Sequence, residues 1–141
     1  MTNAWRDLGD YTNLPRLGSL AISPQGRVLV SVAHRNRERT GHRSSWWELD
    51  PEGQRPARRL TRSEEGESFG AFTVDGDFLF GSKRPVPGTD EVKPDEDDGV
   101  VWWLPAEGGE AHPVARRSGG FSGVVAATGS RTVIARAPAH I

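Results

Sequence analysis

Residues 66–70 read Gly-Glu-Ser-Phe-Gly and match the pattern G-x-S-x-G, in which the central serine can be a catalytic nucleophile. That chemistry needs a buried apolar strand before the serine and a helix after it, so that a strained turn lifts the hydroxyl to the top of a sheet. Here residues 61–65 are polar, and residues 71–76 read as a strand that runs into an Asp-Gly turn. We therefore interpret Ser68 as a strand residue. A small self-contained hydrolase that uses Ser68 is the alternative.

The acidic insert, residues 85–99, invites a calcium site. Its Asp95, Asp97 and Asp98 precede Gly99, so the glycine comes one residue too early for a D-x-D-x-D-G loop, and Pro94 would stand in the first ligand place. We expect a solvated loop, which could also contact a neighbouring domain.

The basic segment, residues 34–44, contains His34 and His42. No further His, Cys or carboxylate stands at a ligand-like spacing, so these histidines are interpreted as exposed loop residues. The segment has no interleaved aromatic residues of the kind that bind nucleic acid. No catalytic, metal or cofactor site is therefore predicted in this chain, and neither nucleic acid nor membrane is an expected partner.

The elements that carry these residues repeat. Residues 22–31 and 72–81 share an apolar strand end, a polar tetrad closed by glycine and a second apolar run, and residues 125–135 are a fainter third copy. The turn glycines Gly26 and Gly76 are about 50 residues apart, which is a spacing typical of propeller blades. Glycine suits such hairpin turns because it adopts φ > 0 without steric cost.

A second repeat, out of phase with the first, supports this interpretation. Trp47-Glu48-Leu49 and Trp102-Trp103-Leu104 each run into a turn that contains Pro, Glu and Gly, and short strands are expected at residues 58–61 and 112–115. One unit is then four antiparallel strands, which is one blade. Because successive strand residues point to opposite faces, one tryptophan of each pair, 46–47 and 102–103, should lie between blades and the other on the opposite face.

The sequence therefore predicts an all-β fold, an incomplete β-propeller with two four-stranded antiparallel blades and the start of a third. The expected divisions are a lead-in over residues 1–18, a first blade over 19–66, a second over 67–118 and a partial third blade over 119–141. A closed ring takes typically 4–8 blades, so we expect the 141 residues to be a piece that lacks a catalytic domain.

Composition agrees with a β-rich protein outside membranes. The chain has 17 Gly and 10 Pro, a net charge of −1, and only 35% hydrophobic residues. Its lack of cysteine fits a reducing compartment and excludes a thiol nucleophile or a Cys-based zinc site. The first residues contain no basic stretch followed by an apolar one, so no signal peptide is expected and the cytoplasm is the expected location.

The order of these motifs resembles the blade repeat of the propeller in the prolyl oligopeptidase family of serine peptidases, and it is also similar to TolB-like periplasmic propellers. Residues 7–11 (Asp-Leu-Gly-Asp-Tyr), Leu14-Pro15 and residues 23–26 (Ser-Pro-Gln-Gly) resemble the start of the bacterial acylaminoacyl-peptidase-like branch, as does Pro-Ala-Arg-Arg-Leu-Thr at residues 56–61. The resemblance extends over nearly the whole chain. The missing signal peptide argues against the periplasmic group.

This resemblance implies a non-catalytic role. In the family, the propeller caps an α/β-hydrolase domain and restricts access to short peptides, and the Ser, Asp and His of the catalytic triad lie in that separate domain. The expected partners are therefore the hydrolase domain of a parent chain and, through it, short peptide substrates. The alternative is a stand-alone or TolB-like propeller that serves as a protein-binding scaffold.

Overall fold

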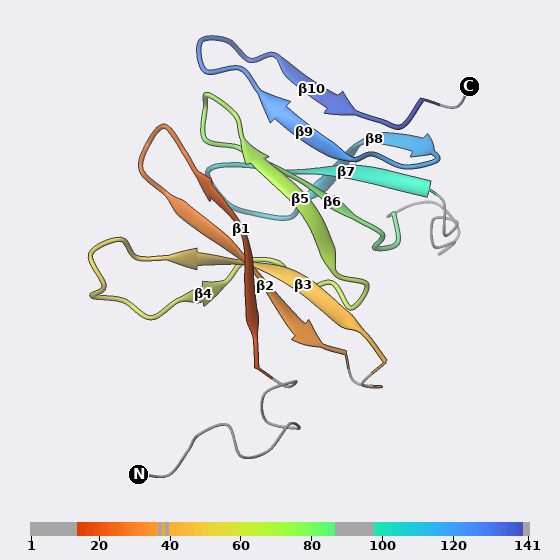
Figure 1. Ribbon diagram of the computed structural model, residues 1–141. Helices are drawn as coiled ribbons and strands as arrows, with labels where there is room; N and C mark the ends of the chain where they lie inside the picture. The colour runs from red at the N-terminus through yellow and green to blue at the C-terminus, as the bar shows by residue number, and fades with distance from the viewer. Residues whose placement is uncertain (1–13, 37, 39, 87–97, 140–141) are drawn as a thin grey trace.

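The computed structural model describes residues 14–36, 38, 40–86 and 98–139. All regular structure in these residues is β, which confirms the expected all-β class (Figure 1). This described part of the chain contains no helix long and apolar enough to cross a membrane.

Two of the three sheets have four antiparallel strands joined in sequence order. The first sheet consists of β1 (Arg16–Ile22), β2 (Val28–Arg35), β3 (His42–Leu49) and β4 (Arg58–Arg59). The second consists of β5 (Glu67–Phe72), β6 (Phe78–Ser82), β7 (Asp98–Leu104) and β8 (His112–Ser118). A two-stranded sheet, β9 (Gly123–Ala126) and β10 (Val133–Arg136), follows them. β1 begins three residues before the range 19–66 that we expected for the first blade.

The first hairpins of the two larger sheets close in the same way. The amide of Ser23 donates to the carbonyl of Arg27 at 2.9 Å, and the amide of Thr73 donates to the carbonyl of Asp77 at 2.8 Å. Gly26 and Gly76 have φ angles of 88° and 86°, a region in which other residues are strained. The turns of these two repeats therefore need glycine for the expected reason, its positive φ. The third turn differs, because Gly129 lacks a positive φ.

The cross-strand register repeats as well. Val30 pairs with Trp47 in the first sheet, and Phe80 pairs with Trp102 at the corresponding place in the second. Each first strand also has a register shift near its beginning, between Leu17 and Leu20 in β1 and between Glu67 and Gly70 in β5. The two sheets are therefore copies of one unit in their strand-pairing register as well as in their sequence.

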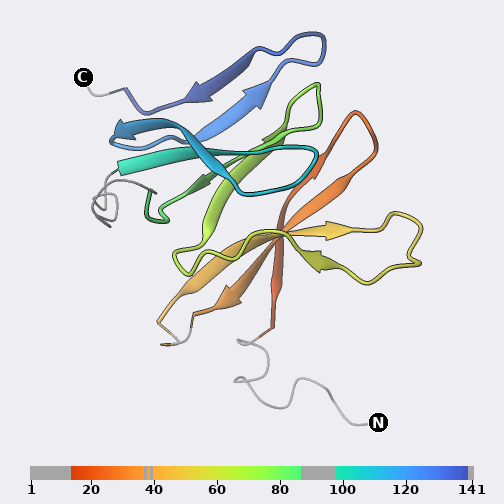
Figure 2. The same ribbon diagram turned by 180° about the vertical axis from the view of Figure 1, so that it is seen from behind.

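The sheets stack, with the second sheet in the middle (Figures 1 and 2). Its even-numbered residues on β6 and β7 face the first sheet and form one core cluster with it: Ala21, Leu29, Trp46, Phe72, Phe78, Phe80, Val100 and Trp102. On the opposite face, Leu79 and Val101 pack with Val124 of β9 in a second cluster, with Trp103 beside them. Strand alternation thus gives the middle sheet two apolar faces.

The expectation for the tryptophan pairs is confirmed. Trp46 is fully buried between the first two sheets, and Trp47 lies half-buried on the opposite face of its sheet. Trp102 is buried against the first sheet, and Trp103 packs against the second cluster on the other side.

Three further sequence boundaries need correction. Asp98 and Gly99, expected in the irregular insert, begin β7. Both ends of the basic segment are strand, because β2 continues to Arg35 and β3 begins at His42. The expected strand at residues 58–61 contains only Arg58 and Arg59, although the amide of Leu60 still donates to the carbonyl of Trp46 at 2.8 Å. The expected lead-in over residues 1–18 falls mostly outside the described residues.

The first strand of each sheet lies next to the first strand of the following sheet, since β5 contacts both β1 and β9. The outward faces of the stack are open in the described residues. Ile22 on β1 is 62% exposed and Val125 on β9 is 51% exposed, and Leu20 and Ile134 are exposed beside them. The three sheets do not close into a ring within these residues.

Candidate functional site

The strongest concentration of polar chemistry surrounds Glu67 at the start of β5, where the two larger sheets meet. Its carboxylate is buried and accepts hydrogen bonds from the hydroxyl of Thr61 at 2.9 Å, from Nη2 of Arg84 at 2.8 Å and from the amide of Ser63 at 3.3 Å. The hydroxyl of Thr61 also accepts a hydrogen bond from the amide of Trp46 at 2.8 Å. The network therefore connects the first sheet to the second.

The cation of this network is fixed by aromatic rings. The guanidinium carbon of Arg84 lies 5.1 Å from the ring centroid of Phe80 and 5.0 Å from that of Trp102. A guanidinium over aromatic faces is stabilised by the negative potential of the ring. Arg84 thus neutralises Glu67 while its planar group covers the edge of the core.

Burial raises the pKa of the Glu67 carboxyl, and the hydrogen bonds from Thr61 and Arg84 offset only part of that effect. Folding therefore favours the protonated carboxyl. The stability that this group contributes is fully present below the ordinary glutamate pKa and is lost as the pH rises through the higher pKa of the folded state.

We predict that Glu67→Gln abolishes this loss. Urea unfolding at a series of pH values between about 4 and 7 should show a smaller decrease of stability with rising pH in the variant than in the wild type. Glu48→Gln is the matched control of opposite sign. Burial opposes ionisation of Glu48 as well, but hydrogen bonds from Arg27 and Arg58 lower its pKa overall. Stability from Glu48 is therefore lost as the pH falls. Equal pH slopes for wild type and Glu67→Gln would contradict the prediction.

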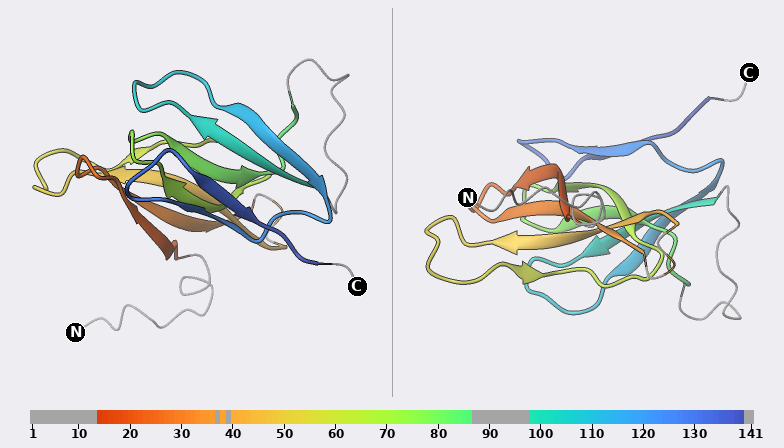
Figure 3. Two further views of the ribbon diagram at one scale, coloured as in Figure 1. Left: turned by 90° about the horizontal axis from the view of Figure 1, so that it is seen from above. Right: turned by 60° about the horizontal axis from the view of Figure 1, so that its bottom comes forward.

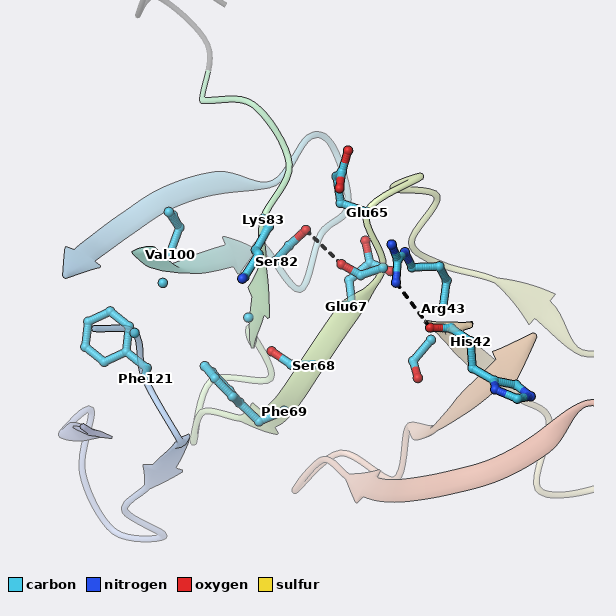
Figure 4. A pocket seen from close by; sticks show the side chains of 15 residues that line it. His42, Arg43, Glu65, Glu67, Ser68, Phe69, Ser82, Lys83, Val100 and Phe121 are labelled. Atoms are coloured by element: carbon cyan, nitrogen blue, oxygen red, sulfur yellow. Dashed lines mark hydrogen bonds between the residues drawn. The ribbon is translucent and has the colours of Figure 1, made fainter. Parts of the chain in front are cut away.

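A hollow of about 240 Å³ lies beside Glu67 and is lined by Gly66, Glu67, Ser68 and Phe69, the first four residues of the G-x-S-x-G pattern (Figure 4). His42 and Arg43 of β3, Ser68 and Phe69 of β5, Lys83 after β6 and Phe121 before β9 line it. Figure 4 shows the ring of His42 directed away from Ser68. Among the described residues, the hydroxyl of Ser68 makes no hydrogen bond to a histidine or a carboxylate.

Ser68 is the second residue of β5, and a strand follows it. This agrees with its interpretation as a strand residue, because a nucleophile elbow needs a helix there. Its carbonyl accepts a hydrogen bond from Nε1 of Trp46 at 3.2 Å. A Cβ added at Gly81 on the neighbouring strand would come within 2.3 Å of the Ser68 hydroxyl oxygen. The Ser68 side chain therefore occupies the space that Gly81 leaves by having no side chain.

The first sheet contains the reciprocal pair. A Cβ at Gly18 of β1 would meet the hydroxyl oxygen of Ser31 on β2 at 2.5 Å, and that oxygen accepts a hydrogen bond from the amide of Ser19 at 2.8 Å. Each four-stranded sheet thus places one serine against one glycine next to its register shift, with the two strands exchanged. This packing explains both glycines and Ser68 without catalysis.

We expect Ser68→Ala to change the free energy of unfolding by no more than about 0.5 kcal/mol, because the side chain is exposed. We also expect no covalent labelling of the wild-type chain by a fluorophosphonate probe. Labelling that is present in the wild type and absent from Ser68→Ala would support the small-hydrolase alternative.

The other sequence candidates lie apart. His34 is in β2, where its ring packs 6.2 Å from that of Trp47, and Asp98 accepts hydrogen bonds from Arg116 at 2.6 and 3.1 Å. Asp95 and Asp97 lie outside the described residues. Within the described ranges, no group of three or more His, Cys, Asp or Glu side chains could hold a metal ion. The buried network of Glu67 was missed in the sequence analysis. The only sign of this network in the sequence is a carboxylate beside a repeated strand.

Comparison of the chain with family models, with curated proteins and with solved structures finds no match.

Proposed function

We propose that this chain is part of the ring of a β-propeller, and that the ring caps the α/β-hydrolase domain of a serine peptidase similar to those of the prolyl oligopeptidase family. In this role the chain supplies rigid walls and no catalytic group. The observation that carries the proposal is the stacking of two four-stranded sheets in one register, with their first strands β1 and β5 side by side and β9 next to β5. First strands that lie side by side are what a propeller needs around its central channel.

The groove along these first strands supports the same arrangement. It has a volume of about 590 Å³ and is lined by residues of all three strands, among them Ala21 of β1, Ala71 of β5 and Ala126 of β9. In a closed ring this groove is the wall of the channel. The exposed apolar residues on the two outward faces are then the contacts for further blades, because a propeller buries each blade against its neighbours.

The cap restricts substrates by size. The walls contain no triad among the described residues, so hydrolysis is assigned to the hydrolase domain, and the ring admits only short peptides to it. The cytoplasm is the proposed location. A propeller that binds other proteins without any hydrolase domain is the alternative.

Reading of the coding DNA beyond the codon of Ile141 tests both proposals. We expect further copies of the unit of about 50 residues, followed by a hydrolase domain with Ser, Asp and His in that order, in the same or a shifted frame. Further copies without a hydrolase domain would establish the scaffold alternative. The absence of further copies in every frame would overturn the propeller.

A further inference from the structure

The hairpin of β9 and β10 has an open edge. The amide of Ala127 donates to the carbonyl of Thr132 at 2.9 Å, which closes the hairpin. Backbone groups alternate in direction along an antiparallel pair, so those of Val133 and Ala135 point away from β9. In the described residues, no strand pairs with this edge of β10.

A cleft of about 370 Å³ lies along the same edge. Its floor is the second sheet, with Leu79 of β6 and Val101 and Trp103 of β7, and its wall is formed by Val133 and Ala135 of β10. The cleft exists because the hairpin covers only part of the second sheet. Seen from above in Figure 3 (left), β7 and β8 extend beside the hairpin. Val114 of β8, also on the cleft, is 53% exposed.

The two complete sheets show what occupies this position elsewhere. In the second sheet, β7 pairs with β6 there, and Trp102 opposite Phe80 is 1% exposed because it is buried against the first sheet. Phe80 and Ala135 are equivalent, since Phe78 and Val133 each follow the turn and pair with the last residue of the preceding strand. A third strand beside β10 would therefore put a side chain opposite Ala135 onto Val101 and Trp103.

We propose that the open edge of β10 and the cleft beside it bind an extended segment of another polypeptide by strand addition. The segment lies antiparallel to β10, with apolar residues at alternate positions and a tryptophan opposite Ala135, the pattern of β7. Backbone hydrogen bonds to Val133 and Ala135 hold the segment, and the pockets for alternate side chains select it. In the ring of the proposed function, the next strand of the third sheet would take this place, so the binding applies to the chain while the edge of β10 is unpaired, and it depends only on the edge and the cleft.

A peptide with the sequence of Asp98–Leu104, carrying terminal lysines for solubility, is the probe. Added to the isotope-labelled whole chain, it should shift the amide resonances of Val133 and Ala135 and protect both amides from exchange. In the second sheet, the turn closed by the hydrogen bond from Thr73 to Asp77 fixes the same alternation in the direction of backbone groups along the strands. By this alternation, the first tryptophan of the probe directs its amide at β10, and the second tryptophan directs its amide away from it.

Two probes that differ only in one methyl group provide the control. N-methylation of the first tryptophan should weaken binding at least about tenfold, because it removes a backbone hydrogen bond and places a methyl group against the edge. N-methylation of the second tryptophan should leave binding within about twofold of the unmodified probe. This comparison requires no protein variant.

The complementary protein variant is Ala135→Pro. Proline is tolerated on an edge strand, and here it removes an amide that points to the open edge. Its amide spectrum should resemble that of the wild type away from β10, and probe binding should fall at least about tenfold. Failure of the unmodified probe to bind, equal binding of the two methylated probes, or unchanged binding to Ala135→Pro would each overturn the proposal.

Discussion

Replacement of Trp46 by alanine is expected to lower the free energy of unfolding by about 3–5 kcal/mol, the usual cost of removing a fully buried large aromatic side chain. Trp46 is 0% exposed, and its ring meets that of Phe78 of the second sheet edge-to-face at a centroid distance of 5.0 Å. Its indole nitrogen also donates to the carbonyl of Ser68. The variant therefore loses both packing and a hydrogen bond between sheets. Urea unfolding followed by circular dichroism measures the effect.

Trp47→Ala is the matched control, with the same residue type one position later. Trp47 lies half-buried on the outward face, where its indole nitrogen donates to the hydroxyl of Ser45 within the same sheet at 3.0 Å. We expect a loss of about 1 kcal/mol, as for most partly exposed positions. Equal losses for the two tryptophans would contradict the stacking of the sheets through Trp46.

Gly70→Ala is expected to destabilise the chain by about 3 kcal/mol, or to prevent folding, because overpacking a filled core forces rings and backbone apart. An added Cβ would lie 2.3 Å from Cζ of Phe78 and 2.7 Å from Cζ2 of Trp46. Both rings belong to the buried cluster and have little room to move. The measurement is the same unfolding experiment, with amide spectra for variants that remain folded.

The control for this substitution is Gly129→Ala in the third turn. A Cβ added at Gly129 would have no atom within 4 Å, and the backbone there has no positive φ. We expect a change within about 0.5 kcal/mol. A neutral Gly70→Ala would show that β5 does not approach the aromatic cluster as closely as described.

The repeated unit could be predicted from the sequence because its signals are local. Turn glycines such as Gly26 and Gly76 report a backbone conformation, and alternation along β6 and β7 reports two apolar faces. Strand ends were less accurate. Asp98 pairs with Ser118 of β8 and forms an ion pair with Arg116, 18 residues away, and no local pattern shows either contact.

The remainder depends on contacts between neighbouring strands and between sheets, and no local pattern in a single sequence shows these contacts. Gly18 faces Ser31 in the first sheet, and Ser68 faces Gly81 in the second, so serine and glycine exchange strands. This relation is visible only when the two strands of each pair lie side by side. The burial of Glu67 depends in the same way on Thr61 and Arg84, which flank it from different segments. These pairings explain the residues of the apparent nucleophile motif by packing.

The proposed ring requires further sheets of the same kind to cover the two outward faces and to enclose β1, β5 and β9. Determination of the structure of the polypeptide encoded by the complete reading frame around this chain tests it most directly. We expect four-stranded sheets stacked on the face of Ile22 and on the face of Val125, with the first strand of every sheet around one central channel. A structure in which both faces remain exposed to solvent, or in which the added segments form a single sheet continuous with β4 or β8, would contradict it.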